Sequence, residues 1–175
     1  RYHSPWGPQA MGADDFSTVI DQLADTPRFV SEAFGSVSPA SWDLRLDGVE
    51  FSLREAVCHL RDIELEGYLV RVFRMAAERA QLLAELDGAR LAAERGYGTQ
   101  DPVMAVGDFV ALRALTVAKL RQLPPEAWAR TGLFAADAPF SLSELAAMML
   151  HHDEEHCADI GLLTQAPEIL LERIT

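Results

Sequence analysis

The sequence is poor in positive charge. Its 175 residues include 15 Lys and Arg against 27 Asp and Glu, which gives a formal charge of −12 and a pI of about 4.7. A nucleic-acid-binding protein needs a basic face to displace counterions from phosphates, and an anionic membrane surface repels an acidic protein. We therefore expect neither as a partner. Lys119 is the single lysine, and this arginine skew, with abundant Ala and Leu, suggests a GC-rich bacterial genome.

Cysteine and long apolar runs are also scarce. Cys58 and Cys157 are too few for a disulfide framework in a chain of this length, so we expect a cytoplasmic protein. No apolar run approaches the ~20 residues that a membrane-spanning helix needs. Residues 1–12 hold two prolines and no apolar stretch, so they are no secretory signal, and the missing initial Met suggests a processed or partial chain. We expect a flexible arm over 1–12 and a single domain over 13–175.

Four long segments show helical periodicity, and nothing between them predicts a strand pair. They run from about Asp15 to Phe34, from Ser52 to about Leu86, from Pro102 or Val103 to Leu123, and from Ser141 to about Leu163. Within the first segment, Thr26-Pro27 predicts either a kink or a fresh start with Thr26 as N-cap. The pattern predicts an all-α protein, a four-helix bundle.

Local signals give these boundaries a physical cause. Ser52 with Glu55, and Ser141 with Glu144, have the spacing of a capping box, in which each side chain satisfies a backbone N–H of the first helical turn. Pro124-Pro125 stops the third helix.

Three histidines lie where apolar residues are expected. His152 and His156 are four positions apart, so their side chains share one face of the fourth helix. That face continues in Leu145, Met149, Ile160 and Leu163. His59 lies on the predicted inward face of the second helix, with Ala56, Ile63, Val70 and Phe73. If the two helices face each other at the same depth, the three imidazoles form one metal site with a coordination position left for water or substrate.

Other interpretations of the histidines were compared with this one. A lone histidine on an apolar face is more often a satisfied core residue. A zincin needs Glu directly after its first histidine, where this chain has Asp153, and a di-iron bundle needs Glu three residues before each histidine, where it has Ala56 and Asp153. One metal on three histidines fits better, and three imidazoles suit Zn, Ni, Cu and Fe alike.

Several charged residues could assist such a site. Asp62 and Glu66 follow His59, and Glu155 and Asp159 follow His152 and His156, so each could orient a ligand ring or be a solvated surface acid. Arg113 lies on a predicted buried stripe. It therefore needs an internal salt bridge, for which Glu66 is a candidate, or it anchors a substrate carboxylate.

The two cysteines are predicted to be packing residues. Each is one position, about 100°, from its neighbouring histidine, so one helix face cannot present both side chains.

These residues resemble a known family. The segments FSLREAVCHLRDIE (51–64), FVALR (109–113), 120–128 and HDEEH (152–156) occur in the order and spacing of the DinB/YfiT-like metalloenzymes, and the resemblance covers about Asp15 to Leu163. It implies a four-helix bundle that binds Zn²⁺ or Ni²⁺ through His59, His152 and His156. Dimers are common in the family, so a homodimer is an expectation too.

The resemblance also implies a chemistry. Members with assigned activity use the metal to activate a low-molecular-weight thiol, among them bacillithiol S-transferases and a mycothiol-dependent maleylpyruvate isomerase. The isomerase has Glu where this chain has His152, so its chemistry does not carry over. The first hypothesis is a metal-dependent thiol S-transferase or hydrolase with a small-molecule substrate, favoured by an open metal position beside Arg113. The alternative is a metal-binding bundle without catalysis, in which Glu66 or Cys58 closes the site.

Overall fold

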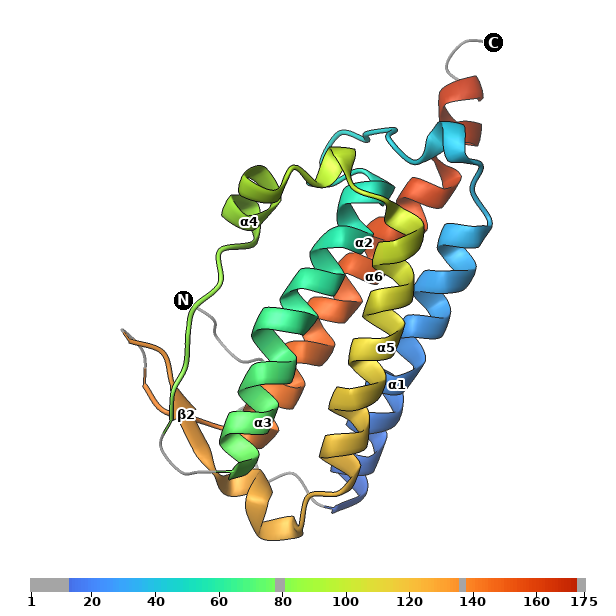
Figure 1. The fold of residues 1–175 in the computed structure, drawn as a ribbon. Helices are drawn as coiled ribbons and strands as arrows, with labels where there is room; N and C mark the ends of the chain where they lie inside the picture. Colours follow the sequence, from blue (N-terminus) through green and yellow to red (C-terminus); the bar gives the residue numbers. More distant parts are fainter. Residues whose placement is uncertain (1–12, 78–80, 136–137, 173–175) are drawn as a thin grey trace.

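The computed structural model describes residues 13–77, 81–135 and 138–172, and its core is a bundle of four long rods (Figure 1). Three rods are single helices: α1 (Ala13–Gly35), α5 (Pro102–Arg121) and α6 (Leu142–Glu172). The fourth is continuous through α2 (Leu53–Asp62), a π-helical turn (Ile63–Tyr68) and α3 (Leu69–Ala77). The α1 helix and the α2–α3 rod each pack against both α5 and α6. The expected four-helix bundle is confirmed.

Short elements connect the rods. The α1–α2 connection holds the 3₁₀ turn Pro39–Ser41, and the α3–α5 connection holds helix α4 (Gly88–Arg95) and the turn Tyr97–Thr99. A further 3₁₀ turn, Pro125–Ala129, follows α5. None of the helices in the described part of the chain is long and apolar enough to cross a bilayer. The predicted arm over 1–12 lies outside the described residues.

Both predicted capping boxes are present. Ser52 accepts a hydrogen bond from the backbone N–H of Glu55, whose side chain accepts from the N–H of Ser52 at 2.9 Å. Ser141 and Glu144 repeat the arrangement at the start of α6. Because caps are local chemistry, these two helix starts were predictable from the sequence.

Helix α1 continues through Pro27, so the predicted fresh start there is wrong. Thr26 does not cap a helix; its hydroxyl donates to Asp153 Oδ2 of α6 at 2.8 Å. Pro27 has no N–H, so the carbonyl of Leu23, four residues earlier, loses its helical partner. Arg113 Nη1 donates to that carbonyl at 3.3 Å. A side chain of α5 therefore satisfies the acceptor that the proline leaves free.

The predicted inward face of the second rod is correct for the first half of the rod and wrong for the second. Ala56, His59 and Ile63 are buried, but Val70 and Phe73 are 43% and 45% exposed. The π-helical turn inserts about one extra residue, which rotates all later positions by about 100°. Val72, Met75 and Tyr68 fill the core instead.

A small three-stranded sheet at one end of the bundle contradicts two predictions, the helix continuing to Leu86 and the absence of strand pairing. β1 (Gln81–Leu82) pairs in parallel with β2 (Thr131–Leu133), which pairs antiparallel with β3 (Phe140–Ser141). Gly132 allows close packing here, because a Cβ on it would lie 2.7 Å from Leu83 Cδ1. Pairing with distant residues thus overrides the helical pattern of 81–86.

Candidate metal centre

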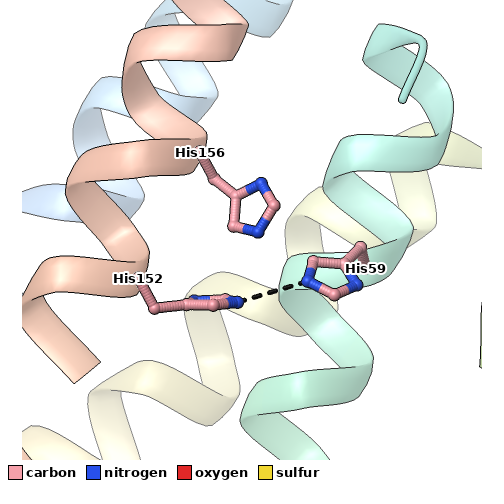
Figure 2. A group of neighbouring side chains, drawn as sticks. All are labelled: His59, His152 and His156. Atoms are coloured by element: carbon pink, nitrogen blue, oxygen red, sulfur yellow. Dashed lines mark hydrogen bonds between the residues drawn. The ribbon is translucent and has the colours of Figure 1, made fainter. Parts of the chain in front are cut away.

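The structure brings the three histidines together between α2 and α6 (Figure 2). His59 on α2 faces His152 and His156, one turn apart on α6. The Nε2 atoms of His59 and His152 are 3.2 Å apart, and one ring nitrogen from each residue lies within 4.8 Å of the others. Two zinc ligands at about 2.0–2.1 Å in tetrahedral geometry are separated by a similar distance.

Two of the imidazoles are held neutral. Burial, followed by the charges of the other two histidines, lowers the pKa of His59 to about 3. Burial and His152 lower the pKa of His156 to about 4. A neutral imidazole has a free lone pair, which is the form that binds a metal.

Aromatic rings and a glycine shape the walls of the cluster. Phe51 lies against His59, with ring centroids 4.9 Å apart, and Tyr68 meets His152 edge-on at 5.6 Å. Gly88, at the start of α4, packs directly on His59, because a Cβ on Gly88 would lie 2.5 Å from His59 Cε1. Only a residue without a side chain permits this approach.

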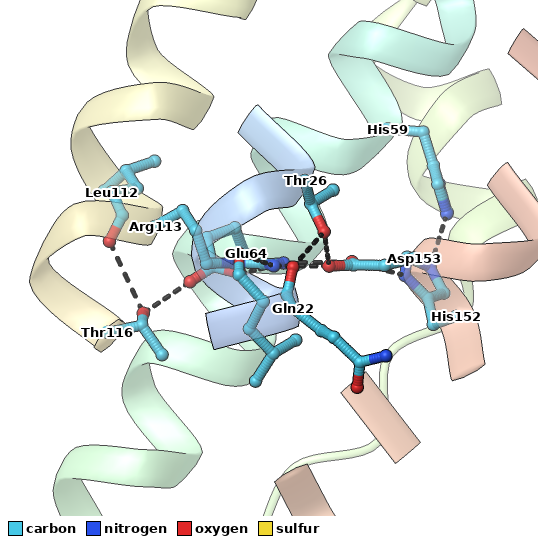
Figure 3. Close-up of polar contacts among 10 residues, drawn as sticks. Gln22, Thr26, His59, Glu64, Leu112, Arg113, Thr116, His152 and Asp153 are labelled. Atoms are coloured by element: carbon cyan, nitrogen blue, oxygen red, sulfur yellow. Dashed lines mark hydrogen bonds and ion pairs between the residues drawn. The ribbon is translucent and has the colours of Figure 1, made fainter. Parts of the chain in front are cut away.

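A buried network of charges adjoins the cluster (Figure 3). Arg113 donates through Nη2 to Asp153 Oδ1 and through Nε to Glu64 Oε2, both at 3.0 Å. Thr116 donates to Glu64, and Thr26 donates to Asp153. Arg113 and Asp153 are each 1% exposed and Glu64 is fully buried. Burial opposes the charged form of Asp153, but Arg113 outweighs it and lowers the pKa of that carboxyl.

Asp153 also connects this network to the histidines. Its Oδ1 lies 3.9 Å from His152 Nδ1, which is longer than a hydrogen bond but close enough for the carboxylate charge to act on the ring. A carboxylate beside the outward-facing nitrogen of an imidazole orients the ring and raises its basicity.

Arg113 forms an internal salt bridge, which was one of its two predicted roles, but its partners differ from the predicted one. Glu64 and Asp153 bind it, whereas the proposed partner Glu66 is 38% exposed and pairs with Arg95. The π-helical turn is the physical reason, because it directs Glu64 rather than Glu66 into the core. With both carboxylates and the Leu23 carbonyl as acceptors, Arg113 is not placed to anchor a substrate.

The other predicted second-sphere acids lie elsewhere. Asp62 is buried, and hydrogen bonds from Arg61 and Arg95 outweigh its burial and lower the pKa of its carboxyl. Its ion pair with Arg95, at 2.8 Å, ties α4 to α2, so Asp62 supports the segment that packs on His59. Glu155 is 64% exposed and pairs with His151 on the surface of α6.

Neither cysteine is a ready nucleophile. Burial raises the pKa of the Cys58 thiol to about 11, and Cys157 is raised likewise. A thiol attacks as its thiolate, so both are inert near neutral pH. Their predicted packing role agrees with the full burial of Cys58 and the partial burial of Cys157.

Sequence reasoning missed Asp153, Glu64 and Tyr68. A signal existed for the two acids: Asp153 continues the stripe Leu142–Leu145–Met149, and Glu64 continues the stripe Leu53–Val57–Leu60. An acid on an apolar stripe needs a buried cation, and Arg113 was the candidate. Tyr68 had no such signal, because its orientation depends on the π-helical turn.

A separate groove lies at the end of the bundle that carries the small sheet, and Ser141 of β3 is in its lining. Phe16, Ile20, Leu120 and Trp128 are among the residues that line it. Phe16 is ten residues, or about 15 Å of helix, from Thr26 and the charge network. This groove therefore contributes nothing to the histidine cluster.

Comparison with known proteins places this arrangement in a family. The fold matches that of YfiT from Bacillus subtilis, described as a probable metal-dependent hydrolase with an unusual four-helix bundle topology, at a TM-score of 0.84 and 19% identity over 93% of this chain and 94% of that one. It also matches a mycothiol-dependent maleylpyruvate isomerase, at a TM-score of 0.64 and 16% identity, with 83% of this chain covering 60% of that one. No curated protein is significantly similar in sequence. Residues 22–160 match the sequence profile of the DinB superfamily, and the chain therefore belongs to that superfamily.

Proposed function

We propose that the protein is a divalent-metal-dependent enzyme that activates a thiol or a water molecule for attack on a small electrophile. The observation that carries this proposal is the convergence of three imidazoles, two of them held neutral, on one point between α2 and α6. Zinc or nickel through His59, His152 and His156 is the cofactor that we propose, with a low-molecular-weight thiol as cosubstrate.

The charges next to the histidines give a further reason to expect a cation. The adjoining network has two carboxylates against one guanidinium, which leaves one negative charge in excess inside the bundle. A divalent cation beside His152 would compensate it.

Three protein ligands would leave a coordination position open on the ion, which supports catalysis over a purely structural role. Structural zinc sites are usually closed by four protein ligands. Among the described residues the cluster contains three candidate ligands, and the predicted closing ligands are placed elsewhere, Glu66 on Arg95 and Cys58 fully buried in the core. A metal-binding bundle without catalysis is the alternative.

The roles of the chain's own residues follow from their contacts. The three imidazoles would hold the ion, and Asp153 would orient His152 with its charge fixed by Arg113 and Thr26. Phe51 and Tyr68 pack against the rings and limit their rotation. A bound divalent ion lowers the pKa of a coordinated thiol or water and so supplies a nucleophile near neutral pH.

The two structural relatives support different halves of the proposal. YfiT is described as a probable metal-dependent hydrolase, and the isomerase is mycothiol-dependent. Hydrolysis and thiol transfer to an electrophilic carbon therefore both stand as reactions for the same site. The homodimer and the cytoplasmic location stay predictions.

Metal content tests the proposal directly. Elemental analysis of protein purified without an affinity tag should give close to one zinc or nickel per chain, and His152→Ala and His59→Ala should lose it. His151→Ala is the matched control, since His151 is the neighbouring histidine that faces away and pairs with Glu155. Metal loss only in the first two variants, followed by turnover in a screen of thiols and electrophiles, supports an enzyme. Stoichiometric metal without turnover would favour the non-catalytic alternative, and no metal uptake would refute both.

A further inference from the structure

We propose that Arg71 and Tyr68 form an anion subsite next to the histidine cluster, which binds a carboxylate carried by the small molecule that reacts there. The inference rests on the proposed function, because it assumes that a ligand binds at the three histidines. Arg113, the sequence-based candidate for this role, is fully engaged in the core, so any cation that binds a substrate anion must be another residue.

Arg71 is half-buried, and its contacts with the described residues are two aromatic rings and a backbone carbonyl. Its guanidinium packs over the rings of Tyr68 and Phe134, at 5.7 and 4.9 Å from their centroids, and its Nη2 donates to the carbonyl of Ala84 at 2.9 Å. Its Nε is buried without an acceptor, and no carboxylate among the described residues forms an ion pair with it. Glu85 acts on it only from a longer distance. A guanidinium has five donors, and among the described residues only a carbonyl, that of Ala84, accepts from this one.

This arginine contrasts with others in the same region. Arg61 and Arg95 both bind Asp62, and Arg113 binds Glu64 and Asp153. In a chain with a formal charge of −12, carboxylates are abundant, so a partly buried arginine that has no carboxylate partner in the described part of the chain is unusual. Contact with two ring faces and the bond to Ala84 restrict the guanidinium, and such preorganisation favours bidentate carboxylate binding.

The subsite lies next to the metal centre through Tyr68. The Tyr68 ring contacts both groups, His152 at 5.6 Å between ring centroids and the Arg71 guanidinium at 5.7 Å from its centroid. Segment 84–88 runs along the same rod: Ala84 contacts Arg71, Leu86 lies over Gly67, and Gly88 lies over His59. Because four residues span at most about 13 Å, the Arg71 guanidinium and the His59 ring lie within reach of the two ends of one small molecule.

The π-helical turn produces this alignment. In an uninterrupted helix, Arg71 would follow His59 by twelve steps and point about 120° away from it. With one residue absorbed by the turn, the offset falls to about 20°. The extra residue therefore places an arginine on the same side of the rod as the histidine.

A carboxylate preference that depends on Arg71 tests the proposal. The protein is loaded with Co²⁺, whose visible absorption changes when a ligand binds, and titrated with mercapto acids from 3-mercaptopropionate to 6-mercaptohexanoate, each beside its neutral amide. In a second arm, succinate and succinamide compete with 2-mercaptoethanol. Wild type should bind at least one acid about tenfold or more tightly than its amide. Arg71→Met and Arg71→Gln should lose that preference while keeping full Co²⁺ content, and Arg28→Met, an exposed arginine on α1, should keep both.

Each outcome bears on the proposal. A preference confined to the mercapto acids assigns the carboxylate to the thiol, and one confined to succinate assigns it to the electrophile; either supports the subsite. Thiol binding without any carboxylate preference, or a preference that survives in both Arg71 variants, would overturn the subsite and leave the proposed function intact. Absence of Co²⁺ uptake by wild type would overturn the proposed function and the subsite with it.

Discussion

Replacing Arg113 with Met should destabilise the protein more than any exposed ion-pair deletion. The variant keeps most of the side-chain volume but leaves the carboxylates of Glu64 and Asp153, 0% and 1% exposed, without their shared cation. Removing one partner of a buried ionic group costs about 3–5 kcal/mol. Since domains of this size are stable by about 5–15 kcal/mol, the variant should still fold with a reduced margin.

Urea denaturation followed by circular dichroism measures the effect of Arg113→Met. The matched control is Arg121→Met, which deletes an ion pair with Asp21 whose side chains are 55% and 65% exposed and should cost less than about 1 kcal/mol. An Arg113→Met loss as small as that of the control would refute the network as a determinant of stability.

The pH dependence of the Arg113→Met deficit gives an independent check. In wild type the pKa of Asp153 is lowered, so its contribution to stability is present above the unfolded value near 3.8 and is lost as the pH falls further. Without Arg113, burial should raise that pKa, and the folded variant should bind protons that wild type does not. The difference in free energy of unfolding should therefore be largest at neutral pH and shrink towards pH 4. A difference that stays constant over this range would indicate lost packing rather than lost charge pairing.

Two further substitutions test the surroundings of the histidines. Gly88→Ala places a Cβ 2.5 Å from His59 Cε1, so the ring or segment 84–88 must move. Metal affinity, measured by competition with a chelator, should therefore fall. Gly107→Ala is the control and should leave the affinity unchanged, because nothing lies within 4 Å of a Cβ at that position. Asp153→Asn keeps the shape but removes the charge beside His152, and metal affinity should fall by about 10–100-fold. Glu155→Gln, on the exposed side of the same helix, is its control, and equal affinities in the two variants would exclude Asp153 as an orienting residue.

The parts of the fold that were predictable from sequence are those fixed by local chemistry. The starts of α2 and α6 follow from capping boxes, and the end of α5 follows from a double proline. His59, His152 and His156 were identifiable because each interrupts an apolar stripe at helical spacing, which needs no knowledge of the partner helix. Their meeting at one depth was a prediction from resemblance, and the structure brings them together.

The failed predictions all depend on contacts between distant residues. No local pattern marks the turn Ile63–Tyr68. A 3.6-residue period extended through it predicts that Glu66 and Val70 face the core, whereas Glu64 and Val72 do so in the structure. The strand Gln81–Leu82 exists because it pairs with residues about 50 positions away, which outweighs its helical period. Thr26 and Pro27 gave a clear local signal for a break, but Arg113 supplies the missing donor and lets α1 continue.

The buried Arg113 and the half-buried Arg71 have different roles, the first in stability and the second in the proposed recognition of an anion. Arg113 donates to two carboxylates and to a backbone carbonyl that a proline leaves without a helical partner. Its donors are therefore engaged within the fold. Among the described residues, Arg71 contacts two ring faces and one carbonyl, which restrict it without neutralising its charge. The same π-helical turn governs both, because it directs Glu64 towards Arg113 and brings Arg71 round to the side of His59. A π-helical turn is less favourable than a regular one, and such turns occur frequently at functional sites. Here it directs Glu64 into the core and places Arg71 on the same side of the rod as His59.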